Sequence, residues 1–265
     1  MSRTILRYGW LGTGGPPALV FLTFVGAWYG YSALVGPTER NISSPYPHAV
    51  VQTVFGDLSN LSELLKATWV TTKVASVGLV IAMAVGILFA VLMSQAKWIE
   101  RSFYPYAVLL QTVPILALVP LIGLRWGFGF KSRVIVCVII SLFPIITNTL
   151  FGLKSTERGH GDLFLLHNAP RLTRLRKLHF PAALPAMFTG FRISAGLSVI
   201  GAIVGDFFFG RGEKGLGIKI RDYTNFLETE MLIGGIILSA LLGIAMFQVF
   251  GSIGRAITGA WHDGA

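Results

Sequence analysis

Two glycine-rich segments that contain a lysine are the first places to look for chemistry in this sequence, because such segments can hold the phosphates of a nucleotide. They are residues 127–132 (GFGFKS) and 210–215 (GRGEKG). A P-loop needs two glycines separated by four residues, followed by lysine and then serine or threonine, between a strand and a helix. Neither segment has that spacing or that context. We therefore expect no cofactor and no bound ATP in this chain.

The residues that could ligate a metal or act as a nucleophile are scattered along the chain. They are His48, His160, His167, His179, His262 and Cys137. The histidines have no metal-ligand spacing, and a single cysteine cannot form a disulfide within the chain. An enzyme site needs a nucleophile, a base or metal ligands that converge, and the sequence shows no such set. We predict no catalytic residue, no metal site and no enzymatic activity.

Two charged residues, Arg192 and Asp206, interrupt an otherwise uncharged stretch from residue 186 to residue 209. Charges within a membrane span are candidates for a functional site. If the stretch is helical, 14 residues span about 21 Å, so the two cannot pair within one helix and each is expected near an opposite interface. For Arg192 the alternative to a functional role is extension to the lipid headgroups. Asp206 either lines the outer mouth of a pathway or binds a neighbouring helix end.

The elements that position these residues are predicted to be membrane helices. Only 13% of the 265 residues are charged, against about 25% in soluble domains, and the mean hydropathy is +0.67. A bilayer core about 30 Å thick needs roughly 20 apolar helical residues, and several uncharged intervals are that long. The sequence predicts an all-α polytopic membrane protein of about six transmembrane helices, forming a single transmembrane domain over residues 1–265. The predicted spans are 17–36, 72–95, 103–124, 133–153, 186–207 and 231–254.

The segments outside the spans add three expectations. Arg3 and Arg7 precede an apolar stretch that is too long for a signal peptide and has no cleavage site, so we expect an uncleaved first span. Residues 48–66, after a segment with two prolines, have the spacing of an amphipathic helix at the membrane surface. The formal net charge of +10 is expected to face anionic lipid and a protein partner rather than nucleic acid.

The longest polar loop after these, residues 154–185, carries the most specific pattern. It contains GDLFLLHNAPR at 161–171 and FPAALP at 180–185. This resembles the cytoplasmic "EAA" loop of binding-protein-dependent ABC importer permeases, in which E-A-A-x-x-x-G precedes a hydrophobic-x-L-P ending. Asp162 stands at the glutamate position and Asn168 at the glycine position, while the two alanines are replaced by Leu163 and Phe164. The resemblance implies a coupling loop that contacts an ATPase.

The residue types fit such a role. Asn168 is expected in a left-handed conformation, which asparagine tolerates best after glycine. Asp162 is expected near a helix start, where the helix dipole favours an acid. A short helix with an apolar knob and a basic flank can lie in a groove of a partner; the alternative is a basic loop held at the lipid headgroups. The predicted coupling residues are Asp162, Leu163, Phe164, Leu166, Asn168, Ala169, Pro170 and Arg171.

The third predicted span carries a second match. Residues 111–121 (QTVPILALVPL) and 125–129 (RWGFG) resemble the signature of nitrate/sulfonate/taurine-type importer permeases, as do GFR at 190–192, the stretch before Asp206, and GLG at 215–217. Within that branch the chain looks most like permeases for the thiamine pyrimidine precursor or riboflavin. The prolines are expected to kink the third span, which can line a pathway. The pathway candidates are Gln111, Thr112, Pro114, Pro120, Asn148 and Asp206.

Together the resemblances imply a type I ABC importer permease fold over nearly the whole chain. They imply a permease subunit that passes a small anionic or heteroaromatic solute, namely a sulfonate, nitrate, a thiamine pyrimidine precursor or a riboflavin-like molecule. The implied partners are two cytoplasmic ATPase subunits, which bind ATP, a second permease in a homodimer, an extracytoplasmic solute-binding protein and the lipid bilayer. We expect both termini on the cytoplasmic side of the cell membrane. The alternatives are an ion-coupled secondary transporter or channel, expected to keep acidic residues at mid-membrane, and a membrane enzyme or assembly protein.

Overall fold

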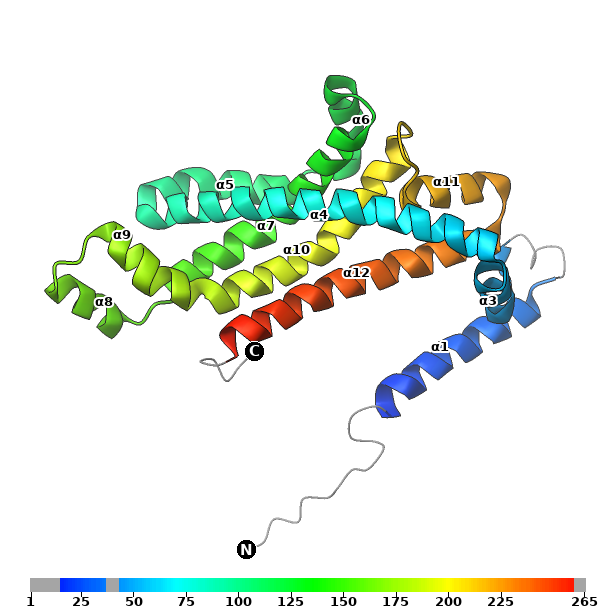
Figure 1. The fold of residues 1–265 in the computed structure, drawn as a ribbon, viewed down its shortest axis with the longest axis horizontal. Helices are drawn as coiled ribbons and strands as arrows, with labels where there is room; N and C mark the ends of the chain where they lie inside the picture. Colours follow the sequence, from blue (N-terminus) through cyan, green and yellow to red (C-terminus); the bar gives the residue numbers. More distant parts are fainter. Residues whose placement is uncertain (1–14, 37–42, 260–265) are drawn as a thin grey trace, which may run out of the picture. The chain divides into compact units, whose positions relative to one another are not determined.

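The computed structural model describes residues 15–36 and 43–259, and every regular element in these ranges is a helix (Figure 1). The described residues fall into two compact units, one within residues 1–62 and 222–234 and the other within residues 63–221 and 235–265. Arg3 and Arg7, on which the expectation for the N-terminus rests, lie outside the described residues.

Five helices are long and apolar enough to cross a membrane. They confirm five of the six predicted spans, although each runs past at least one predicted boundary. The fifth begins well before residue 186, because a helical run from Arg171 leads directly into it. The five are α1 (Gly15–Leu34), α4 (Leu58–Gln95), α7 (Phe130–Lys154), α10 (Phe180–Phe208) and α12 (Thr229–Thr258).

The predicted third span is two helices rather than one kinked helix. Helix α5 (Lys97–Thr112) and helix α6 (Ile115–Trp126) meet at an angle of 97°. The break has a local cause, because the residue before a proline is driven out of the helical region. Val113 is extended, with φ −68° and ψ 126°, and so is Pro114, with φ −60° and ψ 106°. The prediction of a single kinked helix over 103–124 was therefore wrong.

Contacts at its two ends show that this bent pair runs along the length of α7. Near the start of α5, Glu100 forms an ion pair with Lys154, the last residue of α7. Just after α6, the ring of Phe128 lies 6.0 Å from the ring of Phe209, and the Arg211 N–H donates to the Phe128 carbonyl at 3.2 Å. Because α7 begins at Phe130, these contacts are at its opposite end. Counted as one broken span, the pair brings the candidate spans among the described residues to six.

Helices α7 and α10 pack antiparallel through small residues. At each of four glycines a Cβ would lie within 3.1 Å of an atom of the facing helix, so the backbones approach closely, as small residues permit in membrane helices. The Ser194 hydroxyl also donates to the Ser141 carbonyl at 2.7 Å. The facing pairs are Gly152 with Ala183, Gly190 with Pro144 and Asn148, Gly201 with Cys137, and Gly205 with Arg133.

In the smaller unit, a hydrogen bond joins α1 to the segment that leads into α3 (Pro47–Phe55). The Trp28 indole donates to the Pro45 carbonyl at 3.1 Å. The predicted single helix over 48–66 is wrong in extent, because α3 ends at Phe55 and α4 starts at Leu58. The protein itself covers part of the apolar side of α3, since Val54 is fully buried and lies against Gly234, whereas Val51 and Phe55 are 55% and 49% exposed.

Candidate functional site

The 154–185 loop contains two short helices joined by a tight turn. Helix α8 (Arg158–Leu166) is followed by α9 (Arg171–Arg174), a π-helical turn (Leu175–His179) and then α10. Pro181, near the start of α10, has no N–H to donate, and a π turn is a common accommodation where the regular hydrogen-bond ladder is interrupted. The Thr156 hydroxyl lies 3.0 Å from His179 Nδ1, which ties the start of the loop to its end.

The turn after α8 is a Schellman motif with asparagine at the left-handed position. Asn168 has a φ of 50°, which confirms the predicted left-handed conformation. Its N–H donates to the Leu165 carbonyl at 2.9 Å, and the Ala169 N–H donates to the Phe164 carbonyl at 3.0 Å. These two bonds satisfy carbonyls at the helix end and define the motif. Asn168 thereby fixes the direction in which the chain leaves α8.

The end of α8 presents exposed apolar side chains. Leu163 and Leu166 are 55% and 79% exposed, while Phe164 is half-buried. Leu165, which sequence reasoning did not include, is 54% exposed, and Leu172 in α9 is 74% exposed. Exposed leucines at this density on a short helix are typical of a surface that another protein covers.

One expectation for this loop was wrong. Asp162 was predicted near a helix start, but α8 begins at Arg158 and has no acid in its first turn. The helix reaches further towards the N-terminus than expected and includes Gly159 and Gly161. The helix dipole acts mainly in the first turn, so it gives Asp162 little stabilisation. The acid immediately before the helix is Glu157, at the N-cap position.

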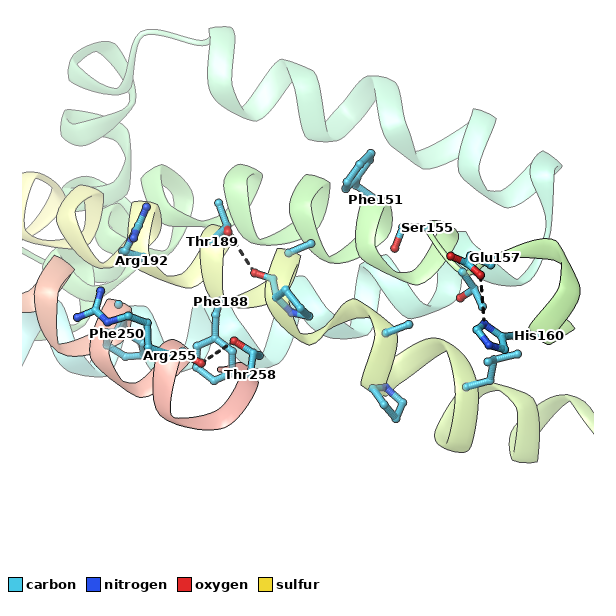
Figure 2. Close-up of a pocket in the computed structure, with 18 residues that line it drawn as sticks. Phe151, Ser155, Glu157, His160, Phe188, Thr189, Arg192, Phe250, Arg255 and Thr258 are labelled. Carbon is cyan, nitrogen blue, oxygen red and sulfur yellow. Dashed lines mark hydrogen bonds and ion pairs between the residues drawn. The ribbon is translucent and has the colours of Figure 1, made fainter. Parts of the chain in front are cut away.

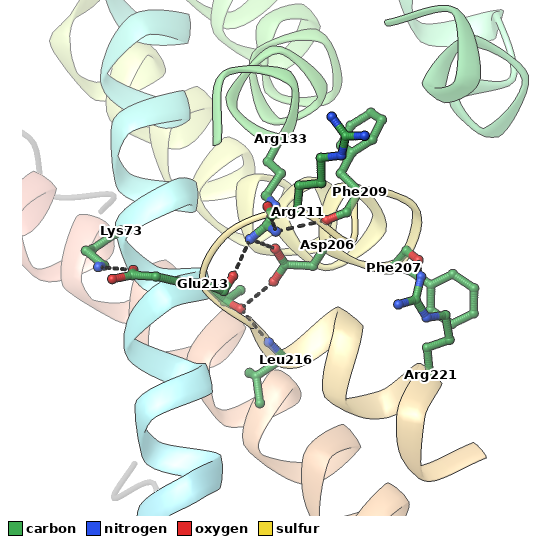
Figure 3. A network of polar contacts seen from close by, with 10 residues as sticks. Lys73, Arg133, Asp206, Phe207, Phe209, Arg211, Glu213, Leu216 and Arg221 are labelled. Atoms are coloured by element: carbon green, nitrogen blue, oxygen red, sulfur yellow. Dashed lines mark hydrogen bonds and ion pairs between the residues drawn. The ribbon is translucent and has the colours of Figure 1, made fainter. Parts of the chain in front are cut away.

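At the other end of α7 and α10, a buried ion pair holds the loop that follows α10 (Figure 3). Arg133 Nη1 lies 2.7 Å from Asp206 Oδ1, and the two side chains are 2% and 0% exposed. Arg133 Nη2 donates to the carbonyls of Phe209 and Arg211, and Nη1 to that of Glu213, each at 2.9 Å. The guanidinium therefore pairs with a carboxylate and also binds three backbone carbonyls of the loop.

The other carboxylate oxygen of Asp206 reaches α4. The Thr71 hydroxyl donates to Asp206 Oδ2 at 3.0 Å and accepts the Leu216 N–H at 2.9 Å. A Cβ on Gly215 would coincide with the Asp206 carboxylate, and one on Gly217 would meet the backbone of α10, so only glycine fits at either position. The GLG segment matched in the sequence thus packs directly on Asp206. Helix α11 (Leu216–Phe226) starts within this segment.

Asp206 was expected either to line the outer mouth of a pathway or to bind a neighbouring helix end, and in the structure it pairs with Arg133 near the start of α7. Sequence reasoning missed its partner Arg133, because that residue only marked the border of an uncharged interval. The sequence did contain a signal for this pairing. Helices α7 and α10 are consecutive long spans and are therefore antiparallel. Arg133, near the start of α7, then lies at the same level as Asp206, near the end of α10.

The remaining pathway candidates fall into two groups. Gln111, Thr112 and Pro114 lie together and exposed at the break between α5 and α6, and Pro120 is exposed on α6. Asn148 lies apart from them on α7, where its Nδ2 donates to the Pro144 carbonyl at 2.8 Å.

Arg192 is half-buried in the structure. Its guanidinium carbon lies 4.7 Å from the centre of the Phe247 ring on α12, a cation–π contact. The side chain therefore packs across a neighbouring helix in this structure.

Comparison with known proteins places these features in context. The sequence pattern of the family "Binding-protein-dependent transport system inner membrane component" matches residues 82–259. The formylaminopyrimidine transport permease protein ThiX of Halalkalibacterium halodurans is 35% identical over 233 residues, which cover 87% of this chain and 90% of that protein. The putative aliphatic sulfonates transport permease protein SsuC of Bacillus subtilis is 28% identical over 239 residues, covering 89% and 83%.

A solved structure shares the fold. The inward-facing MetNI methionine ABC transporter contains a chain that superposes with a TM-score of 0.61 at 17% sequence identity. The superposition covers 76% of the present chain and 99% of that chain.

Proposed function

Because this chain belongs to the family of binding-protein-dependent transport system inner membrane components, we propose that its segment from Arg158 to Arg174 is the surface on which ATPase subunits dock to drive transport. The observation that carries the proposal is the exposed apolar end of α8. Leu163 and Leu166 are exposed there, directly before the left-handed turn at Asn168.

Membership of the family establishes the coarser function. The chain is a multi-pass membrane permease subunit of an ATP-driven importer. Its predicted all-α, type I importer permease fold is confirmed. Subunits of this family work with ATPase subunits, a second permease and a solute-binding protein. This function replaces the ion-coupled carrier or channel that was the alternative from sequence.

Docking of α8 follows from its exposed side chains. An amphipathic helix binds a groove by burying its apolar residues, and full burial of a leucine side chain is worth roughly 1.5–3 kcal/mol. Leu166, at 79% exposure, has the most area still to bury. Arg176 and Lys177, exposed on the π turn, give the surface a basic flank that suits acidic groups on the partner. The coupling residues that we propose are those named from sequence, with Leu165 and Leu172 added.

The proposed docking segment is continuous with the membrane helix α10, so a movement of the segment can be transmitted to that helix. Residues Arg171 to Phe208 form one helical run, so a displacement of the docked segment moves α10 as well. Helix α10 packs on α7 along its length through the small residues described above. We propose that ATP binding and hydrolysis in the partner subunits displace α8, and that α10 transmits this motion to the helices around the solute pathway.

Docking of the ATPases on this loop also implies how the chain is oriented in the membrane and how the transporter is assembled. If the loop at 154–185 contacts ATPases, it is cytoplasmic, and six crossings then put both termini on the cytoplasmic side of the cell membrane. The break between α5 and α6, with Gln111, Thr112 and Pro114 exposed, remains our candidate for the pathway. We propose that the second permease is another copy of this chain, and that ATP is bound only by the partner subunits.

For the solute we propose a small heteroaromatic or anionic molecule. The support is the similarity to a permease named for formylaminopyrimidine and to one named for aliphatic sulfonates. A thiamine pyrimidine precursor is our first choice, because the former relative has the higher identity over a similar share of both chains. Sulfonate, nitrate and riboflavin-like solutes are the other members of the proposed set.

Cysteine crosslinking tests the docking surface. With Cys137 replaced by alanine, Leu166→Cys is combined with single cysteines in the partner ATPase subunit. We expect a disulfide between the two subunits, formed in the complex and altered in yield by ATP. Phe151→Cys is the matched control, since Phe151 is 69% exposed but lies on α7 rather than on α8. A crosslink from Phe151 and none from Leu166 would refute docking at α8.

A further inference from the structure

A cavity among the described residues opens between α10, α12 and the start of the 154–185 loop (Figure 2). Its volume is about 910 Å³. Phe151 on α7, Phe188 on α10 and Phe250 on α12 contribute to its walls. Ser155 and Glu157, at the start of the loop, lie at one end. The cavity thus adjoins both the membrane helices and the proposed coupling segment.

Two arginines converge on this cavity from different helices. Arg192 comes from α10 and Arg255 from the last turn of α12. The Nη1 atoms of the two guanidinium groups lie 3.8 and 3.9 Å from the point that a Cβ on Gly251 would occupy. The glycine therefore leaves room between them, and two like charges share one small region of the cavity wall (Figure 2).

Within the described part of the chain, neither guanidinium has an ion-pair partner. Arg192 Nε is buried and has no hydrogen-bond partner there, although its guanidinium lies over the Phe247 ring. Arg255 donates to the Ser252 hydroxyl at 3.1 Å. Among the described lining residues the acid is Glu157, whose Oε2 lies 3.8 Å from His160 Nδ1 at the other end of the cavity.

A cavity with two adjacent cations and apolar walls fits one class of ligand. Guanidinium groups bind oxyanions through paired N–H donors, and a buried polar N–H without a partner is costly until a ligand accepts from it. The aromatic and proline side chains suit an apolar body attached to the anion. Basic pockets between membrane helices near an interface are a known arrangement for lipid phosphates.

We propose that this cavity is a binding site for an oxyanion attached to an apolar body, with Arg192 and Arg255 as the anion-binding residues. Two sources share that chemistry: the phosphate of an anionic phospholipid, and a soluble organic anion. Bound there, the ligand contacts α10, α12 and residues 155–160, so its occupancy influences how the loop sits on the helices. The inference is independent of which solute is transported.

The test uses the purified permease–ATPase complex in two arms. In the first, the complex is placed in phosphatidylcholine nanodiscs with spin-labelled phosphatidylglycerol or spin-labelled phosphatidylcholine, and the immobilised fraction is measured. In the second, binding of benzenesulfonate is measured by calorimetry in nanodiscs of phosphatidylcholine alone. Each arm compares the unmodified chain with Arg192→Gln, Arg255→Gln and the double variant. Arg125→Gln, an exposed arginine on α6 outside the cavity, is the matched control.

If the source is a lipid, phosphatidylglycerol is preferred over phosphatidylcholine, and each glutamine variant weakens that preference about fivefold, the ratio equivalent to about 1 kcal/mol per basic side chain. If the source is a soluble anion, benzenesulfonate binds the unmodified complex and the double variant loses it. Arg125→Gln changes neither result. Arg192→Lys retains the charge and weakens binding less than Arg192→Gln, which separates binding from misfolding. Equal binding by the double variant, or no binding in either arm, overturns the proposal.

Discussion

Arg133 on α7 and Asp206 on α10 form a fully buried ion pair at 2.7 Å, and the same guanidinium binds the carbonyls of Phe209, Arg211 and Glu213. This single arginine therefore joins two membrane helices and closes the loop that follows α10. The pair lies at the end of α10 opposite the 154–185 loop, so it anchors the far end of the helix that we propose to transmit coupling.

The first prediction concerns this pair. Asp206→Asn leaves the Arg133 charge buried without compensation, and losing one partner of a buried pair costs about 3–5 kcal/mol. We expect a lower melting temperature in detergent, measured by size-exclusion chromatography after heating. Glu213→Gln, which removes the carboxylate of an exposed ion pair, is the control and should shift melting far less. The two variants melting alike would show that the buried pair contributes nothing.

The second prediction concerns two glycines of α10, Gly196 and Gly201. At Gly201 a Cβ would lie 2.8 Å from the Cα of Cys137 on α7, whereas at Gly196 nothing lies within 4 Å. Gly201→Ala should destabilise the protein by about 1–3 kcal/mol because the packed helices must separate. Gly196→Ala should be neutral or slightly stabilising, since alanine is the better helix former. Thermal melting of both variants checks this, and equal melting temperatures would argue against close α7–α10 packing.

The third prediction is a pH dependence. The hydrogen bond and charge of Lys73, whose Nζ lies 2.6 Å from Glu213 Oε2, lower the pKa of Glu213 below its ordinary value of 4.5. A carboxyl with a lowered folded pKa stabilises the fold above its unfolded pKa and loses that contribution as the pH falls through the folded pKa. The unmodified chain should therefore be slightly more stable than Glu213→Gln. This difference in the free energy of unfolding should be complete at neutral pH and lost below pH 4.5.

The difference in stability between the unmodified chain and Glu213→Gln should also decrease in high salt, because the Glu213 side chain is exposed and its charge is screened. Chemical unfolding of both forms across the pH range measures it. An advantage that grows on acidification would contradict the assigned pair.

The fourth prediction concerns topology. With Cys137 replaced by alanine, single cysteines at Ser59 and Ser155 should react with a membrane-impermeant thiol reagent from opposite sides of the membrane. Both positions are exposed, Ser59 at the start of α4 and Ser155 just after α7, whereas Ser44, between α1 and α3, is only 6% exposed and would label poorly. Between them the chain crosses three times, as α4, the α5–α6 pair and α7. Labelling from the same side would contradict the crossing by the bent pair.

Sequence patterns predicted the helices and one turn well, for physical reasons. Uncharged intervals mark spans because a bilayer tolerates few charges, and α7 and α12 cover the intervals predicted for them. Asn168 was identified because few residues other than glycine enter a left-handed turn at low cost, and its φ is 50°.

What sequence patterns missed depends on contacts between distant segments. The 97° break at Pro114 was read as a kink, because a proline by itself does not specify how far the helix axis turns. Arg133 and Asp206 are far apart in sequence, and their pairing follows only from the antiparallel packing of two helices. The cavity with Arg192 and Arg255 likewise needs α10 and α12 side by side. The helix start at Arg158 was missed because glycines ordinarily argue against a helix.

The central claim is that α8 and its turn transmit the work of the ATPase. Transport by reconstituted complexes, together with pull-down of the ATPase, tests it most directly in three variants. Phe164→Ala and Asn168→Pro should insert in the membrane and keep normal melting of the transmembrane helices. Both should lose uptake and retain less ATPase, Asn168→Pro more severely because proline cannot adopt the positive φ of this turn. Asn168→Gly should transport normally, since glycine adopts that conformation readily.

The measurement is uptake per permease, corrected for the amount inserted, for each variant beside the unmodified complex. The account predicts that uptake and ATPase retention fall together in Phe164→Ala and Asn168→Pro and persist in Asn168→Gly. Normal uptake with normal ATPase retention in both Phe164→Ala and Asn168→Pro would contradict the coupling assignment and the orientation that follows from it.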